Sequence, residues 1–144
     1  MERIMKYINR IYRDSLIDRE EAFREHGLGG GQVSYLRLIC SEEGLSQDEI
    51  ARILFVNKSS VTRQLNQLEK IGFVLRKTDE EDRRANRIYP TDKARALFPK
   101  IMEYLDDWNE RITIDVGEQN YDDMVQILRT LARSASHAKR GGKE

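Results

Sequence analysis

The amino-acid sequence predicts a mainly helical fold with a small β wing. The first observation is the order of elements over residues 45–91, where a capped helix, a turn, a second helix and a hairpin with a polar tip follow one another. Apolar residues also recur at helical spacing on both sides of this segment. Charged residues make up 35% of the chain, which indicates a soluble, surface-rich protein. This order of elements is the plan of a winged helix-turn-helix, with one helix for the DNA major groove and a wing for the backbone or minor groove.

Two helices are expected before the central segment. The first is expected over residues 1–25, because large apolar side chains recur there every three or four residues. Gly27 and the glycine run 29–31 are expected to break it. A second helix then follows over residues 32–42 and ends at Gly44.

The helix-turn-helix has clear start signals. Ser46 and Glu49 have the spacing of a capping box, in which each side chain accepts a hydrogen bond from the other residue's backbone N–H. Residues 55–56 form the turn, and Asn57 is a suitable N-cap for the next helix. That helix is expected over residues 58–71.

A hairpin follows the fourth helix. Gly72 is expected to stop the helix as the residue after the C-cap. Strands are predicted over residues 73–77 and 86–89, with a polar tip at 78–84. Thr91 can cap the next helix.

The C-terminal part of the chain predicts two further helices. The fifth helix contains Pro99, which predicts a kink there. A break near Gly117 separates it from a sixth helix. Residues 139–144 are expected to form a disordered tail.

The charge of the chain is unevenly distributed. The net charge is zero, from 25 basic and 25 acidic residues, which argues against a purely electrostatic nucleic-acid binder. Residues 58–77 nevertheless hold five basic side chains and one acidic side chain, Glu69. Acidic residues gather at 79–82, 106–107 and 118–123. We therefore expect one basic face that depends on a specific site more than on bulk charge.

Other bulk properties favour a cytoplasmic protein. No apolar run approaches the roughly 20 residues of a membrane-spanning helix. The first residues carry charge throughout, unlike a secretory signal. The lone Cys40 cannot form an internal disulfide and suits a reducing cytosol.

The fourth helix has a polar stripe opposite its apolar face. Arg63 could form a forked pair with guanine, and the amides of Asn66, Gln64 and Gln67 suit adenine. Hydroxyl groups near the helix N-terminus suit phosphates. The alternative is a solvated helix face, but the capped helix before it and the hairpin after it favour DNA reading. The expected contacts are Lys58, Ser59, Ser60, Thr62, Arg63, Gln64, Asn66 and Gln67.

The tip of the hairpin is the second candidate site. An arginine there could enter a minor groove or pair with phosphate. Because four acidic residues adjoin the arginines, we expect Asp82 to pair with one of them and hold the loop. The alternative is a charged turn that keeps the hairpin soluble. The expected wing contacts are Arg76, Arg83, Arg84 and Arg87.

Several segments together carry a family resemblance. They are 45–51 (LSQDEIA), 58–63 (KSSVTR), 68–74 (LEKIGFV) and the wing pattern Asp79, Asp82-Arg83-Arg84, Ile88-Tyr89-Pro90-Thr91. With these motifs the whole chain resembles the multiple-antibiotic-resistance regulator (MarR) family of bacterial transcription factors. Pro90 and Ala94 depart from the family pattern, which usually has Leu and Gly there, but both follow the wing.

The resemblance implies a homodimer that binds a palindromic DNA operator, more in the manner of a repressor than an activator. It implies one domain over residues 1–144, with dimerisation helices at 1–26 and 91–138 and a DNA-binding lobe at 30–90. Stripes of large residues on the terminal helices support the dimer. A winged helix-turn-helix alone also needs far fewer than 144 residues.

The resemblance also implies a small phenolic or lipophilic effector. Aromatic side chains with polar tips suit phenols, and the residues that could line such a pocket are Tyr12, Tyr35 and Trp108, with Phe23 and His26 beside them. The alternative, which we favour for each of them, is plain core or interface. Cys40 is expected on an apolar face, where a thiol pKa rises and reactivity falls, which argues against redox sensing.

No enzyme site and no cofactor are expected. Two histidines and one cysteine far apart do not have zinc-ligand spacing. The glycine run 29–31 follows no strand, unlike a phosphate-binding loop. A winged-helix protein–protein module, such as an antagonist of another regulator, is the remaining alternative, and the neutral net charge would suit it. DNA binding that weakens steeply with salt would distinguish the two classes.

Overall fold

A computed structural model gives the fold of the chain and describes residues 1–83 and 86–139. The expected wing contact Arg84 and the predicted tail 139–144, apart from Lys139, lie outside this part. In chain order the elements are α1 (Met5–Phe23), the short 3-10 helix η1 (Arg24–His26), α2 (Gly30–Ser41), β1 (Leu45–Ser46), α3 (Gln47–Leu54), α4 (Lys58–Lys70), β2 (Val74–Thr78), β3 (Asn86–Pro90), α5 (Asp92–Thr113) and α6 (Glu118–His137).

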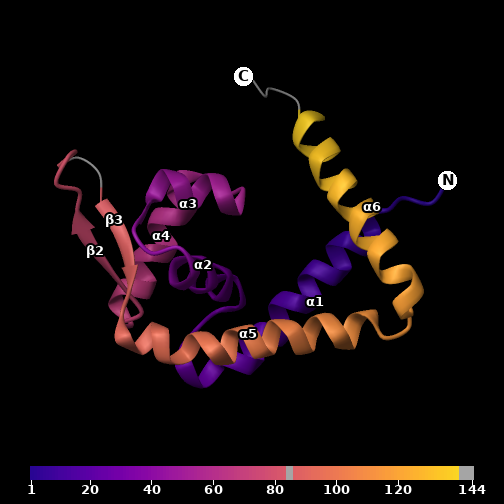
Figure 1. The fold of residues 1–144 in the computed structure, drawn as a ribbon, viewed down its shortest axis with the longest axis horizontal. Coiled ribbons are helices and arrows are strands. Elements are labelled where there is room, and N and C mark those ends of the chain that lie inside the picture. Colours follow the sequence, from indigo (N-terminus) through magenta and orange to yellow (C-terminus); the bar gives the residue numbers. More distant parts are fainter. Residues whose placement is uncertain (84–85, 140–144) are drawn as a thin grey trace. The chain divides into compact units, whose positions relative to one another are not determined.

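The elements form two compact units, Met1–Met102 and Glu103–Glu144. The first unit contains the helix-turn-helix, the sheet and the beginning of α5 (Figure 1). The second contains the end of α5 and all of α6. The predicted class, mainly helical with a small β wing, is confirmed. No helix in the described part of the chain is long and apolar enough to cross a bilayer.

The sheet has one strand more than the predicted hairpin. Its order is β1-β3-β2, and both pairings are antiparallel. The hairpin pairs Arg76 with Ile88, and the added strand pairs Leu45 with the same Ile88. β1 is only two residues long, so it has no alternating pattern that could have predicted it. It ties the segment before α3 to the wing.

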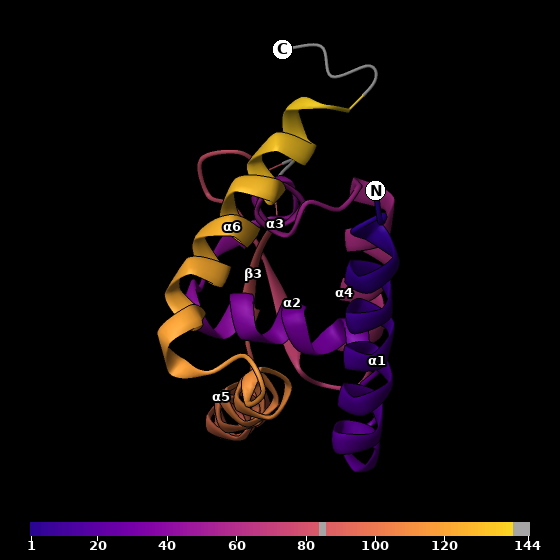
Figure 2. The ribbon, with the colours of Figure 1, turned by 90° about the vertical axis from the view of Figure 1, so that its right-hand side faces the viewer.

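The helix breaks at Gly27 as expected, but only the first glycine of the run 29–31 belongs to the break. The break lies at residues 27–29, and α2 begins at Gly30 with Gly29 as its N-cap. A Cβ atom at Gly30 would lie 2.2 Å from the backbone oxygen of Leu16 in α1. Gly30 is therefore required by the close crossing of α1 and α2, which Figure 2 shows. Breaking a helix is not its role.

Polar side chains reinforce this crossing. Arg19 of α1 donates hydrogen bonds to the hydroxyl of Ser34 in α2 at 3.0 Å and to that of Ser15 in its own helix at 2.9 Å. Ser15 is buried and donates in turn to the Tyr12 carbonyl. The Arg19 guanidinium thus satisfies buried oxygen atoms and fixes α2 against α1.

The core of the first unit lies between the helices and the sheet. Large apolar side chains from α2, α3, α4 and the sheet are fully buried there, including Leu36, Ile39, Ile50, Leu65, Leu68, Phe73 and Ile88. The apolar face predicted for the fourth helix is therefore confirmed.

The connection from the wing to α5 follows the prediction. Thr91 accepts a hydrogen bond from the backbone N–H of Ala94 at 3.3 Å, as an N-cap residue should. The same hydroxyl donates to the Gly72 carbonyl at 2.6 Å. Lys93 donates to the Ile71 carbonyl at 2.7 Å. The end of α4 and the beginning of α5 are thus held by shared hydrogen bonds.

The second unit contains little core of its own. None of the residues of α6 is buried, although the helix is 20 residues long. Within this unit the Asn109 amide donates to the Tyr121 hydroxyl at 2.9 Å, which ties α5 to α6. α5 continues through Pro99, and the kink that the sequence predicts at this proline stays a prediction.

Candidate nucleic-acid interface

The two helices of the helix-turn-helix begin as the sequence predicts. The backbone N–H of Ser46 donates to the Glu49 carboxylate at 2.8 Å, and the N–H of Glu49 donates to the Ser46 hydroxyl at 3.1 Å. Asn57 caps α4 by accepting from the N–H of Ser60 at 2.8 Å. Gly72 follows α4 with a φ of 85°, which favours glycine and ends the helix. Local side-chain chemistry therefore defines the length of α4.

α4 divides into a buried face and an exposed face. Its apolar residues Val61, Leu65 and Leu68 are fully buried. Arg63 lies on the exposed face and forms no ion pair or hydrogen bond with another residue in the described ranges 1–83 and 86–139. Its five N–H donors are therefore available to a partner outside the chain.

Asn66 lies on the same face but is engaged by the wing. Its side-chain oxygen accepts a hydrogen bond from Arg76 of β2 at 2.8 Å. The Arg76 Nε also lies 3.8 Å from the Glu69 carboxylate. Two residues that were predicted as separate contacts, one on the helix and one on the wing, are thus joined.

The two glutamines of α4 lie in different surroundings from Arg63. Gln67 accepts a hydrogen bond from the Gln32 amide of α2 at 2.9 Å. Gln64 is half-buried, and its side-chain oxygen is buried with no hydrogen-bond partner among the residues that the structure describes. Their role as DNA contacts stays a prediction.

The first turn of α4 faces the beginning of α3. Lys58 lies 2.7 Å from the Asp48 carboxylate in an exposed ion pair. The Thr62 hydroxyl donates to the Lys58 carbonyl at 3.1 Å and lies 3.4 Å from the Gln47 side-chain oxygen. The Ser59 hydroxyl donates to the Asn57 side chain at 2.8 Å. A phosphate would therefore compete with Asp48 for the Lys58 ammonium group.

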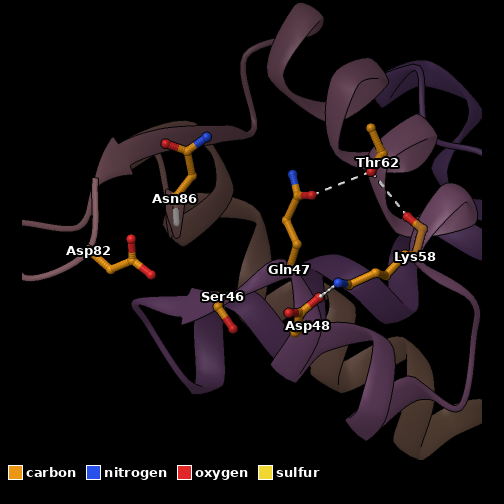
Figure 3. Close-up of a pocket in the computed structure, with 7 residues that line it drawn as sticks. All are labelled: Ser46, Gln47, Asp48, Lys58, Thr62, Asp82 and Asn86. Carbon is orange, nitrogen blue, oxygen red and sulfur yellow. Dashed lines mark hydrogen bonds and ion pairs between the residues drawn. The ribbon is translucent and has the colours of Figure 1, made fainter. Parts of the chain in front are cut away.

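A cleft separates these turns from the wing. Its volume is about 380 Å³, and both helices of the helix-turn-helix contribute to it (Figure 3). Polar side chains line it throughout, so it suits a hydrated, charged partner more than an apolar ligand. The lining residues are Ser46, Gln47, Asp48, Lys58, Thr62, Asp82 and Asn86.

The wing is held by Asp79. One carboxylate oxygen accepts from the N–H of Glu81 at 3.0 Å, and the other accepts from Arg87 Nε at 3.1 Å. These interactions, first the Glu81 N–H and then the Arg87 charge, hold the pKa of Asp79 below its usual value against the effect of burial. Arg87 also donates to the Gly44 carbonyl at 2.8 Å. Asp79 therefore holds the loop, and the predicted pairing of Asp82 with an arginine stays a prediction.

The other wing residues remain to be tested by experiment. Asp82 and Arg83 are exposed. Arg87 is engaged within the chain, so its predicted DNA contact would compete with Asp79. An aspartate whose side chain accepts from the N–H two residues later is the signal that sequence reasoning missed at Asp79.

Comparison with known proteins identifies the family. The sequence pattern of the MarR family matches residues 30–85, which contain α2 to α4 and most of the wing. The HTH-type transcriptional regulator YybA of Bacillus subtilis (strain 168), itself uncharacterized, is 30% identical over 103 residues, 70% of this chain and 67% of YybA. The chain belongs to the MarR family. It is therefore a transcriptional regulator, as the resemblance implied, and the expectation that it is not an enzyme agrees with this family.

Solved structures of related regulators share the fold. The crystal structure of the transcriptional regulator SlyA superposes with a TM-score of 0.91 at 26% identity, over 94% of this chain and 96% of SlyA. Streptococcus pneumoniae FabT, whose structure was solved in complex with DNA, gives a TM-score of 0.78 at 22% identity, over 94% of this chain and 97% of FabT. The winged helix-turn-helix with terminal helices is therefore the MarR fold.

The aromatic residues predicted for an effector pocket of this MarR regulator lie in different surroundings. Tyr35 is only 6% exposed, and burial raises its pKa although the Arg63 charge opposes the rise. Tyr12 is exposed and raises the pKa of Tyr35 further. Trp108 belongs to the second unit, where Arg111 lies 5.1 Å from its ring centre. Tyr12, Tyr35 and Arg63 are therefore close enough to affect one another electrostatically.

Cys40 is half-buried in α2. Burial raises the pKa of its thiol to about 11, although the charge of Arg95 opposes the rise. The sequence-based expectation of a raised thiol pKa is therefore confirmed. A protonated thiol is a poor nucleophile, so this environment does not suit a peroxide sensor.

Proposed function

We propose that this MarR-family regulator binds a palindromic operator as a homodimer and represses transcription until a small effector releases it. The observation that carries the proposal is Arg63, which stands exposed and unpaired within the described residues on the outer face of a capped helix. An arginine in this setting can form two hydrogen bonds with guanine O6 and N7 in the major groove. We place the protein in the cytoplasm because DNA, its proposed partner, lies there.

The wing would add contacts outside the major groove. The exposed Arg83 is suited to phosphate or to a narrow minor groove. We expect Arg83→Ala to weaken DNA binding similarly for all sequences and to reduce the salt dependence by about one counterion. A change in base preference would instead mean that the wing reads the minor groove.

A homodimer would bury apolar surface that each unit leaves exposed. In the first unit, Ile4, just before α1, and Met5, Ile11 and Tyr12 of α1 are exposed. In the second unit, Ile127 and Leu128 of α6 are exposed and no residue of that helix is buried. A solvated helix of this composition gains little stability by itself. Sedimentation equilibrium should therefore give twice the chain mass of 16.9 kDa.

A phenolic or lipophilic effector would act near Tyr12 and Tyr35. The support is the electrostatic effect of Arg63 on Tyr35, because it links a site on α1 and α2 to the proposed base-reading residue. A ligand shifts DNA binding only if its affinity differs between the DNA-competent and incompetent states. A panel of simple phenols should therefore weaken operator binding, and Tyr35→Phe should reduce the effect.

The decisive experiment is selection of bound sequences from a random double-stranded DNA pool at near-physiological salt. The wild-type protein should enrich a palindrome with half-sites about ten base pairs apart. Arg63→Ala should relax the preference at particular base pairs and weaken binding by about 1–3 kcal/mol. Arg10→Ala, which removes the same charge from an exposed position of α1, is the matched control and should leave the motif unchanged.

Two results would contradict the proposal. If a folded, dimeric protein enriched no sequence with or without phenols, the winged helix would serve protein recognition instead. If Arg63→Ala enriched the wild-type motif with full affinity, the stripe on α4 would be a solvated face.

A further inference from the structure

Three helix ends in the first unit share one backbone arrangement. Directly after η1 and α3, and two residues after α4, a residue has a positive φ: 73° at Gly27, 55° at Phe55 and 85° at Gly72. Each residue donates its N–H to the carbonyl three residues earlier. The next residue donates to the carbonyl five residues earlier in all three cases. This pair of hydrogen bonds is the Schellman motif, in which glycine is the usual residue because it has no Cβ.

Phe55 is the exception among these three positions. In the part of the chain that the structure describes, it is the only residue other than glycine with a positive φ. Its side chain is 79% exposed, so the ring gains almost no burial in return for the strained backbone. The same motif has glycine at Gly27 and Gly72, the residue that adopts this backbone conformation without strain. A bulky residue in this conformation that the fold does not need is a reason to look for a function.

The neighbours of Phe55 favour a polyanion as its partner. Between Glu49 and Glu69 the sequence contains no acidic residue and three basic ones, Arg52, Lys58 and Arg63. Phe55 also precedes Asn57, the N-cap of α4, by only two residues. The first backbone N–H groups of α4 and its first basic side chain therefore begin three residues after Phe55. An acidic protein surface would fit the charge, but Phe55 leads along the chain into the helix that we propose to read DNA.

We propose that Phe55 makes an apolar contact with a thymine methyl group at the edge of the major groove read by α4. This inference rests on the proposed function and adds a specificity-determining residue to it. Phenylalanine is one of the side chains that contact the thymine methyl, and this group is the main apolar feature of the major groove. The ring carries no charge, so its contact would contribute to base preference without changing the number of phosphates neutralised.

The test compares wild type, Phe55→Gly and Phe55→Tyr on the operator selected by the wild-type protein. Each protein is also measured on operators in which one thymine at a time is replaced by deoxyuridine, which lacks the methyl group. Phe55→Gly should raise the Tm by a few degrees, because it relieves the left-handed strain. It should also weaken operator binding about tenfold.

The deoxyuridine series identifies the contacted group. One replacement should weaken wild-type binding and leave Phe55→Gly unaffected, because that variant has already lost the ring. Phe55→Tyr keeps the ring and should bind like the wild type. The salt dependence of binding should be the same for all three proteins, whereas Lys58→Ala should reduce it.

Several results would overturn the inference. Phe55→Gly with wild-type affinity and a raised Tm would show that the ring does not touch DNA, and would favour a protein partner for it. A lowered Tm would show that the fold needs the ring. If Phe55→Gly weakened binding to the thymine operator and to every deoxyuridine operator by the same factor, the contact would be to deoxyribose and not to a methyl group. Failure of the wild-type protein itself to bind DNA would overturn the proposed function as well, so the two failures are distinct.

Discussion

Arg76 on β2 donates a hydrogen bond to the side-chain oxygen of Asn66 on α4 over 2.8 Å. The wing strand and the proposed recognition helix therefore share a polar contact on the exposed surface. Glu69, one turn further along α4, lies 3.8 Å from the same guanidinium. The orientation of Asn66, and with it any contact to adenine, depends on a residue of the wing.

This contact predicts that Asn66 and Arg76 are energetically coupled in DNA binding. Arg76→Ala should release the Asn66 amide, so Asn66→Ala should then have a smaller effect than in the wild type. A double-mutant cycle on operator affinity should give a coupling of about 0.5–3 kcal/mol. The control cycle pairs Asn66→Ala with Arg83→Ala, and their effects should add. Additive effects of Asn66 and Arg76 would mean that their hydrogen bond has no part in binding.

The lowered pKa of Asp79 predicts that its contribution to stability depends on pH. The folded-state pKa of Asp79 is lowered, so the folded carboxyl binds a proton more weakly than the unfolded one, whose pKa is about 3.9. Its contribution to stability is therefore complete above the unfolded pKa and is lost as the pH falls through the folded pKa. Asp79→Asn should lower the Tm at pH 7, and the difference should shrink as the pH falls below about 3.9.

The control for Asp79 is Glu80→Gln, which removes one negative charge from the adjacent exposed position. If the effect of Asp79→Asn comes from its specific contacts and not from the loss of a charge, Glu80→Gln should change the Tm little between pH 3 and 7. A pH-independent effect of Asp79→Asn would contradict the pairing with Arg87 and the Glu81 N–H.

Two neighbouring glycines predict opposite effects of the same substitution. A Cβ at Gly30 would lie 2.2 Å from the backbone oxygen of Leu16, whereas a Cβ at Gly31 would meet nothing within 4 Å. Gly30→Ala should destabilise the fold by about 1–3 kcal/mol or more, because α1 and α2 must separate. Gly31→Ala should be neutral or stabilise it by up to about 1 kcal/mol. Urea unfolding monitored by circular dichroism measures both, and equal effects would refute the close crossing.

Cys40 predicts slow thiol chemistry. With a pKa of about 11, only about one thiol in a thousand is ionised at pH 8. Alkylation by iodoacetamide should therefore be slow in the native protein, accelerate as the pH approaches 11, and become fast in urea. Rapid alkylation of the native protein at pH 8 would instead support a redox-sensing role.

Local signals explain the part of the fold that the sequence predicted correctly. Ser46, Asn57 and Gly72 define helix ends through hydrogen bonds to their own neighbours in the chain, so their roles are visible in short segments. The apolar stripe of α4 follows from helical periodicity alone. These residues give the helix-turn-helix and the exposed position of Arg63.

The features that the sequence did not predict depend on distant parts of the chain. Gly30 reads as a helix breaker until Leu16 is known to cross it. The bond between Asn66 and Arg76 requires the packing of the hairpin on α4. Asp79 is one acid among four at the wing tip, and only the position of Arg87 distinguishes it. No local pattern contains this information, because each feature is a contact made after folding.

The shared hydrogen bonds of Thr91 give the recognition helix one fixed end and one adjustable end. The Thr91 hydroxyl joins the Gly72 carbonyl, just after α4, to the first turn of α5, so separation of the two ends would break these hydrogen bonds. Amide protons there should exchange with solvent together and slowly. At the other end, α4 is held to α3 by the exposed ion pair of Lys58 with Asp48, which water can easily replace. Rearrangement of the exposed side chains in the first turn of α4 should therefore cost little, whereas movement of the whole helix is opposed by the fully buried Val61, Leu65 and Leu68.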